Sequence, residues 1–511
     1  MHANRTISSW VAAVSTAALL LSACGGSNTA AAPTTGAAGA AATKPASAAP
    51  AGAATTAMTP TTAAAAPTTA ATTAATSAAT TAATAAATIA ATAAATTAAT
   101  AGATAAATTA STTTGSATAA TTTANTTTTT AAGSGTVKIG VDLPMSGSEA
   151  ANGVPTLNGI KLAIDQANKK GGVAGFKIEV VSLDDAVNGL HDPAQGAKNV
   201  QQLISDNAVL AMVGPFNSNV AKAQIPLTNA AGLAQISMAN TNESLTKPEF
   251  GALDLRKTNP DKIAYFRVCT TDDIQGPAGA DYAAKNLKLM KAFIIDDNET
   301  YGKGIADNWE KQFKADGGTV LGHEHITKGQ QDFTAVLTKA KGTNPDIIYY
   351  GGVSQNGGGL MKKQMKSVAL NIPFMGGDGI VEENFTAQAG DNADNAYGTV
   401  AAVNAETLPE ARDFLDTYKA AYNTAVGPYS ANAFEATNII IAAIDRAAKA
   451  SGGKMPTREQ VRQEVANTKD FKGVIGTTSF DKNGDTTNRW ISIHTTKGGK
   501  WTFLDQIKFG S

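Results

Sequence analysis

Short apolar runs alternate with longer amphipathic stretches along the chain from residue 137 onward. The run at 137–143 predicts a buried strand, and the helical spacing of apolar residues after it ends at Gly171 and Gly172. The same alternation then predicts strands over 176–183 and 209–213 and helices over 194–206 and 221–231. Strands that alternate with helices of this length are typical of βαβ units on a parallel sheet.

A polar stretch over 240–260 interrupts this rhythm, and a second set of elements follows it. Strands are predicted at 292–295, 318–321, 346–350, 372–375, 474–480, 490–494 and 501–507, and helices at 303–315, 332–340, 359–368, 408–423 and 432–450. The pattern predicts an α/β fold of two hinge-linked lobes, each a parallel sheet flanked by helices. Lobe 1 is expected over about 136–271 and 400–483, and lobe 2 over about 273–399 and 486–511. Such a pair predicts a ligand in the cleft between the lobes and a closing hinge.

The first 134 residues differ from the rest of the chain in composition and in pattern. Residues 1–23 resemble an export signal, with Arg5 ahead of an apolar stretch over 10–21 that is too short to span a bilayer of about 30 Å. Leu21-Ser-Ala-Cys24 matches the bacterial lipobox, so we expect Cys24 to be lipidated; a plain secretory signal with a chance cysteine is the alternative. Residues 28–134 are almost wholly Ala and Thr, which predicts that 24–134 is a disordered tether, with a helical stalk as the alternative.

Composition and charge narrow the classes of function. The 511 residues carry a net charge of −1 and 16% charged residues, which argues against a nucleic-acid partner. Cys269 is the only cysteine besides Cys24, so we expect a free, buried and unreactive thiol. Walker A, Gly-x-Ser-x-Gly and dinucleotide-binding patterns are absent, and five histidines offer little acid–base chemistry. We expect no catalytic residue and no cofactor.

Two short patterns are similar to metal-binding motifs, but we interpret one as a surface pair of histidines and the other as a hairpin turn. His323 and His325 would share one face of a strand, but no third ligand is evident, so we expect a surface pair and no metal. The run Asp481-Lys-Asn-Gly-Asp485 is similar to a calcium loop but has Thr486 where the loop needs Gly, so a hairpin turn is predicted.

Several short motifs follow one another along 137–511. They are Lys138-Ile-Gly-Val with Pro144-Met-Ser-Gly147, Asp165-Gln-Ala-Asn168, Ser182-Leu-Asp-Asp185, Asp272-Asp-Ile-Gln-Gly-Pro277, Asp296-Asp-Asn-Glu-Thr-Tyr-Gly302, Asp346-Ile-Ile-Tyr-Tyr-Gly-Gly352 and Phe374-Met-Gly-Gly-Asp-Gly379. By their order and spacing the sequence resembles the type I periplasmic binding proteins, and among them the branched-chain amino-acid (Leu/Ile/Val) receptors of ABC importers. The resemblance covers nearly all of 137–511.

The resemblance implies a site for a zwitterionic amino acid. Ser218, in Gly214-Pro-Phe-Asn-Ser218, matches the serine that meets the ligand carboxylate, and Ala239 and Thr241 match a backbone contact and a threonine. Tyr301 matches an aromatic wall, and Asp378 stands where the family places the acidic residue for the ammonium group. The weaker candidates for pocket lining are Phe216, Asn217 and Tyr429. Four of the stronger candidates also have a plain structural interpretation: a helix cap for Ser218, a turn cap for Thr241, a core position for Tyr301 and a turn aspartate for Asp378.

Three departures from the family pattern limit the prediction of the ligand. Val353 stands where the Leu/Ile/Val receptors carry a tyrosine, an aromatic residue expected near Asn152 is missing, and Asn217 replaces one cysteine of a disulfide found in some members. A changed pocket wall leaves the amino-acid class intact but not the identity of its side chain.

We therefore expect an extracytoplasmic lipoprotein, monomeric, that captures a branched-chain or related aliphatic amino acid and delivers it to an ABC permease. Two alternatives remain. One is a ligand-sensing module of the same fold for an amide, urea or aromatic acid, and the other is a surface-display lipoprotein suggested by the long Ala/Thr segment.

Overall fold

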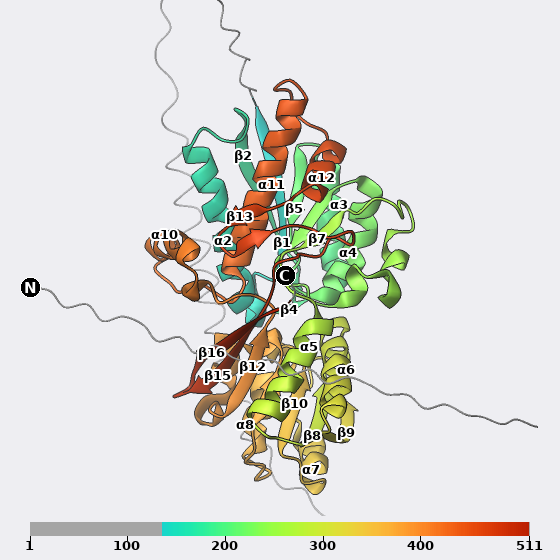
Figure 1. The fold of residues 1–511 in the computed structure, drawn as a ribbon, viewed down its shortest axis with the longest axis vertical. Helices are drawn as coiled ribbons and strands as arrows, with labels where there is room; N and C mark the ends of the chain where they lie inside the picture. The colour runs from blue at the N-terminus through green and yellow to red at the C-terminus, as the bar shows by residue number, and fades with distance from the viewer. Residues whose placement is uncertain (1–134, 510–511) are drawn as a thin grey trace, which may run out of the picture. The chain divides into compact units, whose positions relative to one another are not determined.

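The computed structural model describes residues 135–509, so the predicted signal, the lipidation at Cys24 and the tether lie outside the described residues. Within 135–509 the chain forms two large sheets, each covered by helices, and two small sheets of two strands each (Figure 1). The α/β fold predicted from the alternating pattern is confirmed. No helix in this part of the chain is long and apolar enough to cross a membrane.

The first lobe is built on a five-stranded parallel sheet in the order β2-β1-β5-β6-β7. Its strands are β1 (Thr136–Leu143), β2 (Lys177–Asp184), β5 (Val209–Val213), β6 (Ala234–Ser237) and β7 (Tyr265–Arg267). The helices are α2 (Ala150–Lys169), α3 (Pro193–Ser205), α4 (Ser218–Ala231), α10 (Arg412–Tyr422), α11 (Ser430–Ala450) and α12 (Arg458–Ala466). Helices α2 and α11 pack against each other, and α3 packs against α4. Strand β5 is buried along its whole length, as its unbroken apolar run predicts.

The second lobe has a seven-stranded sheet in the order β16-β15-β12-β11-β10-β8-β9. The parallel strands are β8 (Lys291–Asp296), β9 (Thr319–His325), β10 (Ile347–Gly351), β11 (Phe374–Gly376) and β12 (Ala396–Val400), and the last two are β15 (Arg489–Lys497) and β16 (Lys500–Phe509). The helices are α5 (Asp272–Asp281), α6 (Thr300–Ala315), α7 (Thr334–Gly342), α8 (Gly358–Met365) and α9 (Glu383–Ala389).

The predicted parallel sheet is confirmed for β8 to β12, and two strands at one edge depart from it. Strand β15 runs antiparallel to β12, and β16 runs antiparallel to β15. The second of these pairings follows from the short turn at Gly498 and Gly499, because two strands joined by so few residues can pair only antiparallel.

Two further local predictions need correction. The strand expected at 474–480 is instead a separate hairpin of β13 (Phe471–Gly473) and β14 (Gly476–Thr478), with Val474 and Ile475 in its turn. The sequence pattern also missed β6, β7, β12, α5, α9 and α12, although the last begins with a capping box at Thr457 and Gln460. The turn at 481–485 is confirmed, since the Asp481 carboxylate accepts from the N–H groups of Asn483 and Asp485.

The chain passes between the lobes three times, after β7, after β12 and before β15. Thr270 ties the three passages together. Its N–H donates to the Ala401 carbonyl at 2.9 Å, and its hydroxyl both donates to the Trp490 carbonyl and accepts from the Trp490 N–H. Cys269, next to this residue, is free and buried as predicted, and burial raises the pKa of its thiol.

Candidate ligand-binding site

A cleft with an empty volume of about 380 Å³, its opening included, lies between the two lobes. Its residues come from the ends of strands and the loops and helix starts that follow them, as expected for parallel sheets. The lining residues are His191, Phe216, Asn217, Ser218, Asn219 and Ala239 from the first lobe and Asp297, Glu299, Tyr301, Val353, Asp378 and Gly379 from the second.

The first-lobe wall is the start of α4. Asn217 is the N-cap residue, but its side chain makes no capping hydrogen bond, and Ser218 is the first helical residue. The first N–H groups of a helix have no partner within the helix and carry partial positive charge, so this wall favours an anionic group. The Ser218 hydroxyl accepts only a long hydrogen bond, 3.5 Å from the Asn242 N–H. A ligand carboxylate can therefore accept hydrogen bonds from both the Ser218 hydroxyl and the backbone N–H groups.

The second-lobe wall is centred on Asp378. Oδ1 of this carboxylate accepts from Gln275 Nε2 at 2.8 Å and from the Tyr301 hydroxyl at 3.0 Å. Burial raises the pKa of Asp378, and the hydrogen bonds from Gln275 and Tyr301 oppose that rise. Both of these bonds end on Oδ1, which leaves Oδ2 for a ligand. A carboxylate in so sheltered a place favours a cationic partner.

Glycines let the Asp378 loop approach Tyr301 closely. A Cβ at Gly377 would lie 2.3 Å from the Tyr301 hydroxyl oxygen, and one at Gly379 would lie 2.6 Å from the Gly352 carbonyl oxygen. Neither position has room for a side chain, so packing requires glycine at both 377 and 379.

Apolar surface completes the cleft. Phe216 meets Tyr429 edge to face at 5.8 Å between ring centroids, and Val353 lies against Tyr301 in a small buried cluster. Such surfaces fit an aliphatic or aromatic group better than a charged one. The Tyr429 hydroxyl is buried and has no hydrogen-bond partner among residues 135–509.

Polar contacts join the lobes around the rim of this cleft. Asn219 donates to the Glu299 carboxylate, Asn242 Nδ2 donates to the Thr300 carbonyl at 2.8 Å, and Lys328 Nζ donates to the His191 carbonyl at 2.8 Å. Each bond crosses from one lobe to the other, so the lobes are held together over the cleft.

The structure brings most of the predicted ligand residues together. Six of the eight line the cleft: Phe216, Asn217, Ser218, Ala239, Tyr301 and Asp378. Thr241 and Tyr429 do not line it but are buried behind it, and the Thr241 hydroxyl has no partner among the described residues.

The lining residues not predicted as ligands are His191, Asn219, Asp297, Glu299 and Gly379, besides Val353, which was singled out only as a departure from the family. Asp297, Glu299 and Gly379 lie inside quoted motifs and could have been proposed. His191 comes from the small β3–β4 hairpin (Ala186–Val187, Leu190–His191), where it forms a buried pair with Glu149 at 2.5 Å. We find no pattern in the sequence that indicates this position.

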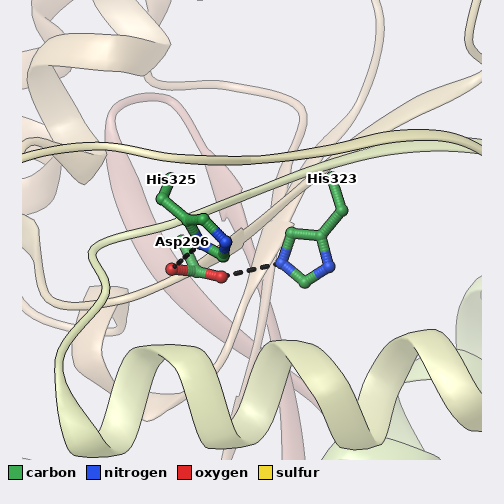
Figure 2. A group of neighbouring side chains, drawn as sticks. All are labelled: Asp296, His323 and His325. Atoms are coloured by element: carbon green, nitrogen blue, oxygen red, sulfur yellow. Dashed lines mark hydrogen bonds and ion pairs between the residues drawn. The ribbon is translucent and has the colours of Figure 1, made fainter.

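The prediction that no third potential ligand lies near His323 and His325 is wrong. His323 and His325 do share a face of β9, but a third group, Asp296 of the neighbouring strand β8, lies between them (Figure 2). The sequence gives no sign of this contact because it depends on the register of β8 and β9, in which Asp296 pairs with His325.

Two lobes joined by three chain passages, with a helix start that favours an anion facing a sheltered carboxylate, are features expected of a hinged receptor for a small solute. Comparisons with known proteins agree. The sequence profile described as "Periplasmic binding protein" matches residues 136–500, and the chain belongs to this family. Members are solute-binding proteins that work outside the cytoplasm, and the predicted resemblance to the Leu/Ile/Val receptors is confirmed.

Two similar proteins carry informative names. The Leu/Ile/Val-binding protein BraC3 of Rhizobium johnstonii is 31% identical over 364 residues, which cover 71% of this chain and 92% of that protein. The crystal structure of the branched-chain amino-acid transporter substrate-binding protein LivJ of Streptococcus pneumoniae, in complex with isoleucine, is 31% identical and has a TM-score of 0.64. That match covers 73% of this chain and 99% of LivJ.

Proposed function

We propose that the cleft captures a neutral amino acid, branched-chain or a related aliphatic one, and that the protein delivers it to an ABC importer. The observation that carries the proposal is the pairing of two opposite walls. The start of α4 with Ser218 offers donors to an α-carboxylate, while Asp378 offers a negative charge to an ammonium group. A zwitterion satisfies both walls at once, and a ligand with only one charge leaves one of them unpaired.

The remaining lining suits an aliphatic side chain. Phe216 and Val353 supply apolar surface, and Tyr301 contributes a ring whose hydroxyl is already occupied by Asp378. The relative from Rhizobium johnstonii is named for Leu, Ile and Val, and the LivJ structure holds isoleucine, which supports the same ligand class here. Because Val353 replaces a tyrosine of those receptors, we leave open which neutral amino acid is preferred.

Capture would require the lobes to open and close at the three passages tied by Thr270. The bonds from Asn219 and Asn242 to the second lobe would form on closure and present one continuous surface to a permease. We further propose that Cys24 carries a lipid anchor and that 24–134 tethers the head to the membrane surface, since Leu21-Ser-Ala-Cys24 matches a lipobox. Loss of the protein from the membrane fraction in a Cys24→Ala variant tests the anchor.

A thermal-shift screen of the full chain against the twenty amino acids, urea, short amides and aromatic acids tests the proposed ligand. A ligand at a hundred times its dissociation constant should stabilise the protein by about 2.7 kcal/mol. The proposal expects the largest shift from leucine, isoleucine, valine or another neutral amino acid. A shift with only a non-amino-acid ligand would contradict the proposed ammonium partner and favour the sensing module.

A further inference from the structure

We infer that Asp296, His323 and His325 form a binding site for a divalent transition-metal ion, with Zn²⁺ as the ion that fits best. This site is independent of the amino acid proposed for the cleft. One nitrogen of each histidine and one carboxylate oxygen of Asp296 all lie within 4.8 Å of one another. Two imidazole nitrogens and one carboxylate are the donors that Zn²⁺ takes in three-ligand sites, where water supplies the fourth position.

The three side chains converge on one point from two paired strands. His323 Nε2 lies 2.7 Å from Asp296 Oδ2, and His325 Nδ1 lies 2.8 Å from Asp296 Oδ1 (Figure 2). Asp296 is the last residue of β8 and pairs directly with His325 in the parallel register. His323 and His325 are two residues apart on β9 and therefore point to the same face.

Glu310 of α6 holds the His323 ring in the orientation that a metal ligand needs. Its Oε2 lies 2.6 Å from His323 Nδ1, and its Oε1 accepts from Lys314 at 2.5 Å. When the Nδ1–H of the neutral ring donates to Glu310, the lone pair is on Nε2 and faces an oxygen of Asp296. Either a proton on Nε2 or a metal ion between the two groups removes the repulsion between these lone pairs, so the same geometry accepts a cation in place of the proton. A carboxylate that orients a histidine in this way is a common feature of metal sites.

Burial and access also fit a bound ion. The Asp296 side chain is fully buried, and its Oδ1 also accepts from the Asn298 N–H at 2.8 Å, so the carboxylate is fixed in place. The His325 side chain is 50% exposed, which leaves a path for an ion and space for a water ligand. Donors at zinc distances are about 3.3 Å apart in a tetrahedral set, so binding requires the two distances between Asp296 and the histidines to lengthen by roughly half an ångström.

The site adjoins the ligand cleft along the chain. Asp297 and Glu299, immediately after Asp296, line the cleft, and Asp297 is held by Asn356 Nδ2 at 2.8 Å. A metal ion at the end of β8 would fix the start of this segment. The expected consequence is a more stable second lobe.

Zinc titration of the full chain, first stripped of metal with a chelator, tests the inference. Isothermal titration calorimetry with Zn²⁺ should show one site of micromolar or better affinity that His323→Ala and His325→Ala each weaken at least tenfold. Glu310→Gln should weaken it by about 10- to 100-fold, as expected when the residue that orients a metal-binding histidine is lost. Binding of Co²⁺ in the same titration should give visible absorption bands that these variants lose.

Glu324→Gln is the matched control, because Glu324 lies between the two histidines on β9 and pairs instead with Lys339 at 2.6 Å. It should keep the zinc site. Circular dichroism of each variant checks that the fold is retained; His325, being half exposed, tolerates truncation best. Absence of micromolar binding by the wild-type chain would overturn the inference. Equal binding by wild type and both histidine variants would also overturn it and leave the three residues as a proton-bridged ion pair.

Discussion

The Tyr301 hydroxyl donates a hydrogen bond to Asp378 Oδ1 at 3.0 Å and accepts one from the backbone N–H of Gly379 at 3.1 Å. One phenol therefore holds both the carboxylate proposed to bind the ligand and the loop that carries it. Because Tyr301 opens α6 and Asp378 follows β11, this contact joins two elements of the second lobe at the cleft.

Gly379→Ala tests whether this loop must lie so close to its neighbours. The added Cβ would stand 2.6 Å from the Gly352 carbonyl oxygen and 2.9 Å from Tyr301 Cε1, so the loop must shift and carry Asp378 with it. We expect at least tenfold weaker amino-acid binding by calorimetry. Gly342→Ala, at the end of α7 with no atom within 4 Å of the new Cβ, is the control and should bind normally. Unchanged binding by Gly379→Ala would mean that the loop geometry is not critical.

Ser218→Ala removes the hydroxyl proposed to meet the ligand carboxylate. Loss of one hydrogen bond to a charged group costs about 1.5–3 kcal/mol, so affinity should fall by roughly 10- to 150-fold. The fold should be unaffected, because within residues 135–509 the only hydrogen bond to this hydroxyl is the 3.5 Å contact from the Asn242 N–H. Ser205→Ala, exposed at the end of α3, provides the comparison. Equal affinity for the two variants would exclude Ser218 as a ligand contact.

Asp485→Ala should destabilise the protein strongly. Arg267 is fully buried, and its Nε lies 2.6 Å from Asp485 Oδ1. Removing one member of a buried ion pair leaves the other unpaired, at a cost of about 3–5 kcal/mol. Urea unfolding measures the difference. Asp254→Ala breaks an exposed pair with Lys257 and should change stability little. A small effect of Asp485→Ala would show that water reaches Arg267.

Glu435 should make the stability depend on pH. Burial raises its pKa to about 8 from 4.5, against the hydrogen bonds from the Val474 N–H and Thr478. The folded state therefore binds this proton more tightly than the unfolded state. The contribution to stability is complete below pH 4.5, falls as pH rises from there to about 8, and stays lost above it.

Glu435→Gln mimics the protonated side chain and removes this dependence. Urea unfolding at pH 6 and at pH 8.5 measures the free energy of unfolding of both proteins. From the lower to the higher pH, the variant's value relative to the wild type's should rise by about 1.4 kcal/mol for each pH unit between the unfolded-state and folded-state pKa of Glu435. Other buried acids are present in both proteins and cancel in the comparison. Parallel pH profiles would mean that Glu435 is already ionised in the fold.

The fold follows from the hydrophobic pattern, whereas strand pairing does not. Runs such as 209–213 are apolar throughout because β5 is covered on both faces, and this makes them visible in the sequence. Elements with weaker patterns, including α5 and β12, were missed because tertiary contacts rather than periodicity stabilise them.

Some residues of the site could likewise be predicted from the sequence and others could not. Ser218 and Asp378 stand in short motifs with a recognisable order, so they could be proposed from the sequence. Asn219 and Glu299 meet across the cleft, 80 residues apart, and only the closed arrangement of the lobes brings them together. Likewise, the contact between Asp296 and His323 depends on the register of two strands that the sequence does not specify.

Titration calorimetry of the neutral aliphatic amino acids with wild type and Asp378→Asn tests the central claim most directly. Asparagine can keep the hydrogen bonds from Gln275 and Tyr301, so the variant changes charge with little change of shape. Loss of a sheltered charge partner costs about 2 kcal/mol or more, so we predict at least about thirtyfold weaker binding by Asp378→Asn. Asp391→Asn, at an exposed aspartate, should match the wild type. Full affinity in Asp378→Asn would contradict the account, because the ligand ammonium would then have its partner elsewhere.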